Sequence, residues 1–154
     1  MLHFLCDLLM IGLLVQISIC DIRTMQIPDR LNLAVLLLGL GRQVVLALWR
    51  SGETAGLLPL AAAVPGGLLA AALPMYLLAV AFPGSLGGGD IKLAAAAGVY
   101  LGAAGVLRGT GAGIVAAGIY AAGCLLLHIK TARQTFPLGP FLALGYLSQI
   151  ICSS

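Results

Sequence analysis

Long apolar stretches, separated by brief polar or Gly/Pro-rich breaks, run through this 154-residue sequence from one end to the other. Hydrophobic residues make up 61% of the chain and charged residues only 8%, against about 25% charged residues in a typical soluble domain. So few charges cannot cover a water-facing surface, and the lipid bilayer is the natural solvent for such a chain. The sequence therefore predicts an all-α, polytopic membrane protein.

The breaks divide the sequence into about six candidate transmembrane helices, each near the length of about 20 apolar residues that a bilayer requires. The connecting segments are short and contain no linker, so we expect a single transmembrane domain over residues 1–154. The expected spans are 2–19, 31–48, 57–81, 91–107, 111–128 and 138–151.

Six helices that alternate in direction place the first, third and fifth connections on one side of the membrane. These connections hold Asp21, Asp90 and the segment 136–140. The same side would carry five Lys and Arg residues and the other side three, so the positive-inside rule favours the first as cytoplasmic. We therefore expect Asp21 and Asp90 to meet at the cytoplasmic face.

Composition also argues against several classes of partner and site. The net charge of +3 is small and scattered, so nucleic acid is not expected as a partner. The four cysteines form no C-x-x-C pair and have no His cluster beside them, which argues against a zinc site or a disulfide framework. We expect no metal.

Asp90 is the most conspicuous of the five acidic residues, because residues 87–93 read GGGDIKL. An ionisable side chain in a membrane helix is costly to bury and is a candidate functional group by default. An ordinary N-cap would explain Asp90 but not the three preceding glycines, which allow close approach of another chain. Gly87, Gly88, Gly89 and Lys92 are predicted to support the site, although Lys92 could simply extend to the interface.

Two other aspartates compete as the partner of Asp90. Asp21 ends the first span; it could be an interfacial charge paired with Arg23, but it lies on the same side as Asp90. Asp29 precedes the second span, where capping that helix is its expected role, and it is the main rival to Asp21. Asp7 lies about 21 Å from Asp21 along one helix, too far to share a site.

Two neighbouring carboxyl groups can hydrolyse a peptide bond without a metal. Like charges about 3 Å apart do not ionise together easily, so one group stays protonated. The ionised group can take a proton from water, while the neutral one hydrogen-bonds the substrate carbonyl. Small residues at four-residue spacing, Gly98 with Gly102 and Gly109 with Gly105 and Gly113, are expected to pack the helices of the bundle closely.

Three segments together resemble the type IV prepilin peptidases. Residues 87–93 look like the family's G-x-G-D motif, residues 21–28 (DIRTMQIP) its first aspartate segment, and residues 136–145 (FPLGPFLALG) its closing motif. The resemblance implies a six-helix enzyme of the bacterial inner membrane, an aspartic endopeptidase with Asp21 and Asp90 as its catalytic pair. It further implies a prepilin or pseudopilin substrate, whose short basic leader is cut just before its hydrophobic helix.

The sequence departs from the family's pattern in two places. Asp29 stands where many members have Asn, and the paired C-x-x-C motifs of the domain linked to methylation have no counterpart. We therefore expect peptidase activity without a cofactor and without S-adenosylmethionine. Two other readings stay open at this point: a small transporter or proton relay, although no internal inverted repeat is visible, and a non-catalytic subunit of a pilus or secretion assembly.

Overall fold

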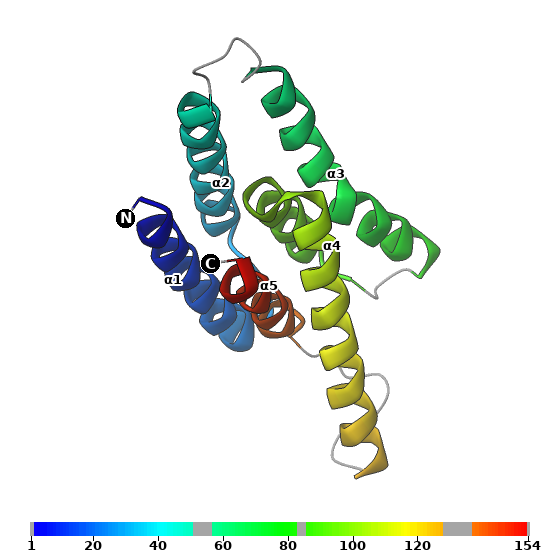
Figure 1. Ribbon diagram of the computed structural model, residues 1–154. Coiled ribbons are helices and arrows are strands. Elements are labelled where there is room, and N and C mark those ends of the chain that lie inside the picture. The colour runs from blue at the N-terminus through cyan, green and yellow to red at the C-terminus, as the bar shows by residue number, and fades with distance from the viewer. Residues whose placement is uncertain (1, 51–56, 83–85, 128–136, 154) are drawn as a thin grey trace.

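The protein is a bundle of helices. The computed structural model describes residues 2–50, 57–82, 86–127 and 137–153, and these ranges contain five α-helices and no strand (Figure 1). Phe136, the first residue of the closing motif, lies outside the described residues. The five helices are α1 (Leu2–Thr24), α2 (Asp29–Arg50), α3 (Leu57–Ala81), α4 (Gly88–Leu126) and α5 (Gly139–Ser153).

Four of the helices among the described residues, α1 to α4, are long and apolar enough to cross a membrane, and α5 is a shorter apolar helix. Their outward faces carry large apolar side chains, as a lipid-facing surface requires. Phe4, Leu48, Ile119, Leu126 and Ile151 are all at least 70% exposed. The all-α membrane architecture is confirmed, while the expected six spans are slightly more than the helices show.

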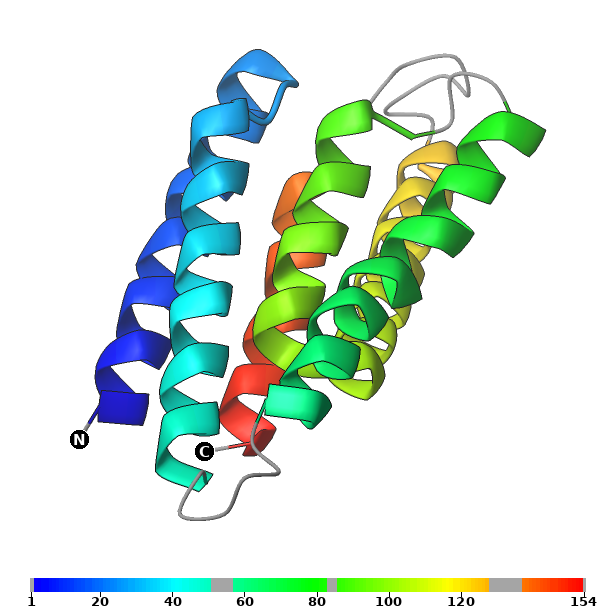
Figure 2. The same cartoon turned by 90° about the horizontal axis from the view of Figure 1, so that it is seen from above.

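Helix α4 accounts for this difference, because it turns back on itself at Gly102. The backbone there has φ 74° and ψ 170°, outside the helical region, and a positive φ favours glycine. Figure 2 shows the two arms, 88–101 in light green and 103–126 in yellow, running in opposite directions. The break was expected near residues 107–111, and Gly102 was expected to pack against a helix; both expectations were wrong, because Gly102 makes the turn instead.

Side chains of α2 stabilise the end of the first arm, where helical carbonyl groups have no partner in the same helix. Arg42 donates to the Tyr100 carbonyl and Gln43 to the Val99 carbonyl, both at 3.0 Å. The Arg42 guanidinium also lies 4.8 Å from the centre of the Tyr100 ring, and the Tyr100 hydroxyl donates to Asp7 on α1. Asp7, Arg42, Gln43 and Tyr100, here named the far-end cluster, thus join three helices.

Glycines set the distances between the helices. A Cβ atom on Gly67 of α3 or Gly98 of α4 would overlap the carbonyl group of the other. In the second arm of α4, a Cβ atom on Gly109 or Gly113 would lie 2.8 Å from the nearest atom of α5, where Gly145 faces both glycines. The expected close packing through Gly98, Gly109 and Gly113 is therefore confirmed, and it holds α4 against α3 and α5.

Candidate active site

A pocket of about 250 Å³ opens where the end of α1 meets the beginnings of α2 and α4. Its walls come from two stretches that are far apart in sequence: residues 21–29, which run from the end of α1 into the start of α2, and residues 87–90 at the start of α4. They are lined by Asp21, Met25, Gln26, Ile27, Asp29, Gly87, Gly88, Gly89 and Asp90. The predicted meeting of Asp21 and Asp90 at one face is therefore confirmed, and their catalytic role stays a prediction.

Asp90 holds the beginning of its own helix with one carboxylate oxygen. Gly87 is the last residue before α4, and its carbonyl accepts from the Asp90 amide at 3.1 Å. In return, Asp90 Oδ2 accepts a hydrogen bond from the Gly87 amide at 3.3 Å. The side-chain bond is the half of a capping box that the third helical residue supplies, with Asp in place of Glu and no side chain on Gly87 to complete it. Asp90 therefore satisfies a free amide at the start of α4 with this one oxygen, although the N-cap residue is Gly87 and not Asp90.

The other carboxylate oxygen of Asp90 does not take part in holding the start of the helix. Oδ1 is buried and accepts no hydrogen bond from the described residues, and only 8% of the Asp90 side chain is exposed. A buried polar atom without a partner is costly, and such atoms in native proteins call for an explanation. The cap therefore fixes the direction of the carboxyl group and leaves one oxygen available for chemistry.

Asp21 is held from a different helix. Its Oδ2 accepts a hydrogen bond of 2.8 Å from the amide of Gly139, the first residue of α5. The carboxylate thus occupies the position at a helix N-terminus where free amides and the helix dipole favour an anion. Asp21 is only 5% exposed, and the described residues show no ion pair between it and Arg23, so the interfacial pairing considered above does not occur.

Three glycines around the site leave little or no room for a Cβ atom. A Cβ on Gly139 would lie 2.8 Å from Asp21 Oδ2, and one on Gly87 would lie 3.0 Å from Asp90 Oδ2. Gly89 faces Ile27 of the α1–α2 connection at the same 3.0 Å. The expected close approach of another segment to the glycine run is thus confirmed for Gly89, whereas Gly87 meets only the nearby Asp90 side chain and Gly88 has nothing within 4 Å.

The two carboxyl groups are near enough for the charge of Asp21 to act at Asp90. Both enter the same pocket, and each has one oxygen bonded to a glycine amide. Within the described parts of the chain, no group of three or more His, Cys, Asp and Glu side chains could hold a metal ion. Two carboxyl groups that line one pocket can exchange protons with a water molecule there.

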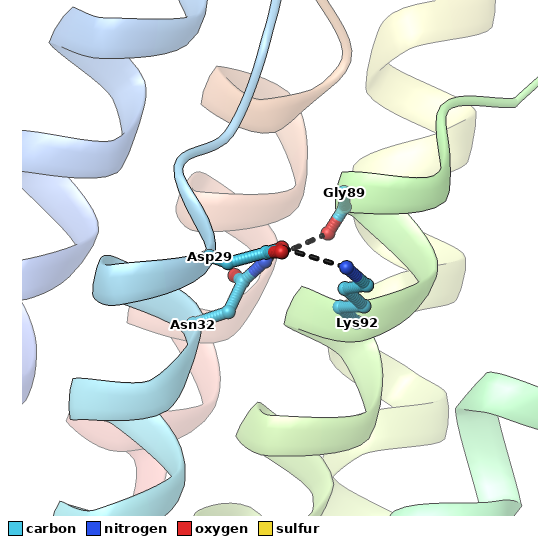
Figure 3. A network of polar contacts seen from close by, with 4 residues as sticks. All are labelled: Asp29, Asn32, Gly89 and Lys92. Carbon is cyan, nitrogen blue, oxygen red and sulfur yellow. Dashed lines mark hydrogen bonds and ion pairs between the residues drawn. The ribbon is translucent and has the colours of Figure 1, made fainter.

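Asp29 and Lys92 close the outer edge of the site (Figure 3). Lys92 Nζ lies 2.7 Å from Asp29 Oδ1, with the two side chains 59% and 73% exposed. One turn into α2, Asn32 Nδ2 donates to the Gly89 carbonyl at 3.4 Å. We expected Asp29 to cap α2 and Lys92 to extend to the interface; Lys92 is exposed, but the two side chains pair with each other and join α2 to α4.

Two features of the site were not predicted from the sequence. The Gly139 amide belongs to the quoted closing motif, but nothing in that motif connects it with Asp21, 118 residues away. Asn32 lies within an apolar run and was passed over, although a buried Asn in a membrane helix is itself a signal. Both contacts depend on which helices are neighbours, and the spacing of residues along the chain does not give that.

The sequence model of the type IV leader peptidase family matches residues 8–127. The match contains Asp21, the glycine run and Asp90, and it ends before α5. No curated protein and no solved structure matches the chain. Because the match covers most of the sequence and includes both carboxyl groups of the pocket, the chain belongs to the type IV leader peptidase family.

Proposed function

We propose that the protein is a membrane aspartic endopeptidase that removes the leader peptide of type IV prepilins or pseudopilins, with Asp21 and Asp90 as its catalytic pair. Membership of the leader peptidase family implies a peptidase. The observation that most supports the aspartic mechanism is the single pocket that receives both carboxyl groups from different helices. Asp90 Oδ1, buried and without a partner among the described residues, is the carboxylate oxygen that no hydrogen bond of the fold occupies.

The reaction needs one proton on the pair at the start. The ionised carboxylate takes a proton from water as the water oxygen attacks the scissile carbonyl carbon. The neutral carboxyl group gives its proton to the carbonyl oxygen, so a gem-diol forms. When the C–N bond breaks, the proton taken from water passes to the leaving nitrogen and a gem-diol proton returns to the pair. The products are a carboxylic acid and an amine, and the pair again holds one proton.

The proposed location is the cytoplasmic face of the bacterial inner membrane. The excess of Lys and Arg on the side of the two aspartates supports this location under the positive-inside rule, and a basic leader would lie on the same side as the site. The pocket lies at the ends of α1, α2 and α4, at the edge of the apolar spans, where water can reach it.

The test is cleavage of a type IV prepilin in membranes that contain the protein. We expect Asp21→Ala and Asp90→Ala each to abolish cleavage, and Asp29→Ala to keep most of it, because Asp29 pairs with Lys92 at the exposed edge. Equal amounts of membrane-inserted protein must be shown for each variant. Full cleavage by both Asp21→Ala and Asp90→Ala would refute the mechanism, and loss with Asp29→Ala but not Asp21→Ala would reassign the pair.

A further inference from the structure

A second hollow lies directly beside the site, between α2, α3 and the first arm of α4. This groove has a volume of about 400 Å³ and is mostly apolar. Asp29 lines both the groove and the pocket of the two aspartates, so the two hollows are adjoining. The groove is lined by Asp29, Asn32, Leu33, Leu36, Leu68, Lys92, Ala95 and Ala96.

Asn32 is the one uncharged polar side chain in this lining, and its amide is held in one orientation. Nδ2 donates to the Gly89 carbonyl, so a flipped amide would place oxygen against oxygen (Figure 3). Only 6% of Asn32 is exposed, and Oδ1 is buried without a partner among the described residues. Asn32, which lines the groove beside Asp29, therefore carries a buried hydrogen-bond acceptor that is fixed in place and lacks a donor among the described residues.

We propose that this groove binds the apolar segment of the substrate that follows the scissile bond, with Asn32 Oδ1 accepting an amide N–H from the first turn of that segment. This inference rests on the proposed function, in which the bond is cut just before a hydrophobic helix. The first four N–H groups of any helix lack partners within it. Asn is among the residues that satisfy them best.

The shape and polarity of the groove suit this occupant. Ala95 and Ala96 on one wall leave room for another helix to approach closely, and Leu33, Leu36 and Leu68 give it apolar contacts. A lipid chain would match the apolar walls but has no N–H group for Asn32. Because the groove adjoins the pocket at Asp29, a helix beginning beside Asn32 places the peptide bond before it next to Asp21 and Asp90.

Site-specific photocrosslinking tests the groove. In an Asp90→Asn background that leaves a prepilin uncut, a photoreactive residue replaces Leu33, 54% exposed in the groove, or Leu37, 59% exposed on the same helix but outside the lining. We expect the prepilin to crosslink at least tenfold more at position 33. Equal crosslinking at both positions, or crosslinks to phospholipid alone at position 33, would overturn the proposal.

A second experiment tests the role of Asn32 through the substrate. Asn32→Leu should lower kcat/KM about tenfold, the loss expected when one hydrogen bond of a buried acceptor is removed. Proline tolerates the first helical position but has no N–H, so a prolyl scan of the first turn after the cut site should find one position that slows the wild type and not Asn32→Leu.

The outcomes separate the groove from the chemistry. A purely structural role of Asn32 would slow every substrate equally, so the absence of any position coupled to Asn32 would overturn its assignment. If wild type cleaves the prepilin but no coupling and no selective crosslink is found, the groove inference alone fails. If wild type does not cleave the prepilin at all, the proposed function fails and the inference falls with it.

Discussion

Helix α1 carries an aspartate near each of its ends, and the two are surrounded in different ways. Asp7, in the far-end cluster, accepts a hydrogen bond from the Tyr100 side chain. That tyrosine in turn lies under Arg42, a cation that also holds its backbone carbonyl. Asp21, at the other end, accepts a hydrogen bond from a backbone amide, and neither it nor Asp90 is paired with a cation among the described residues.

The difference separates a structural cluster from a site that can react. At the far end, side chains bond to one another and to the carbonyls that end the first arm of α4, so three helices are joined where the chain turns. At the site, amides orient the carboxylates and leave an oxygen of Asp90 buried and unpartnered. Backbone amides can hold a carboxylate in place without neutralising it, and a proton-transfer site needs this property.

The largest effect should come from changing the two aspartates of α1 in the same way. Asp21→Asn keeps an oxygen that can accept from Gly139 but cannot exchange a proton, so we expect prepilin cleavage to fall about 10³-fold or more. Asp7→Asn keeps an acceptor for Tyr100 and should leave cleavage within about threefold while weakening a charge-assisted bond by roughly 1–2 kcal/mol. Cleavage rates and thermal unfolding in detergent measure the two effects. A large catalytic loss in Asp7→Asn would contradict the comparison.

The sequence predicts one half of this comparison better than the other. Rare acidic residues, apolar spans and alternating direction were enough to bring Asp21 and Asp90 to one face. The far-end cluster was not predicted, because Asp7 was placed only by its distance from Asp21 and the turn was expected after residue 107. A glycine turn inside a run of small apolar residues leaves no polar break in the sequence, so hydropathy cannot locate Gly102.

The next largest effect should come from replacing Gly139, the glycine that contacts Asp21. Gly139→Ala would place a Cβ 2.8 Å from Asp21 Oδ2, so the carboxylate or α5 must shift by several tenths of an ångström. Misplacement of a catalytic group by about 1 Å costs roughly 100-fold, and we expect a loss of about 10- to 100-fold in kcat with the fold retained. Gly118→Ala, with nothing within 4 Å, is the matched control and should keep wild-type activity. Equal activity of the two variants would remove Gly139 from the site.

Toward the far-end cluster, glycines allow two helix backbones to approach each other, whereas at the site they make room for carboxylates. Replacing a glycine there should therefore affect stability and not catalysis. Gly67→Ala would overlap the Gly98 carbonyl group, which cannot move without the helix. We expect about 1–3 kcal/mol of destabilisation from this overpacking. The neighbouring Gly66 has nothing within 4 Å, so Gly66→Ala should be neutral or stabilising by up to about 1 kcal/mol. Thermal unfolding in detergent compares the pair, and similar unfolding temperatures would contradict the packing argument.

The smallest effect should come from the exposed pair at the edge of the site, which resembles the far-end cluster in being paired but not in being buried. Asp29 and Lys92 are more than half exposed, and such ion pairs contribute roughly 0.2–1 kcal/mol, screened by salt. A double-mutant cycle of Asp29→Asn and Lys92→Gln should give a coupling free energy below about 1 kcal/mol that falls between low and high salt. Cleavage by Asp29→Asn should stay within a fewfold of wild type, because Asp29 holds α2 against α4, whereas the proposed mechanism assigns proton transfer to Asp21 and Asp90. If Asp29→Asn instead lost as much activity as Asp21→Asn, Asp29 would take part in the reaction, and its pairing with Lys92 would not mark it as a purely structural carboxylate.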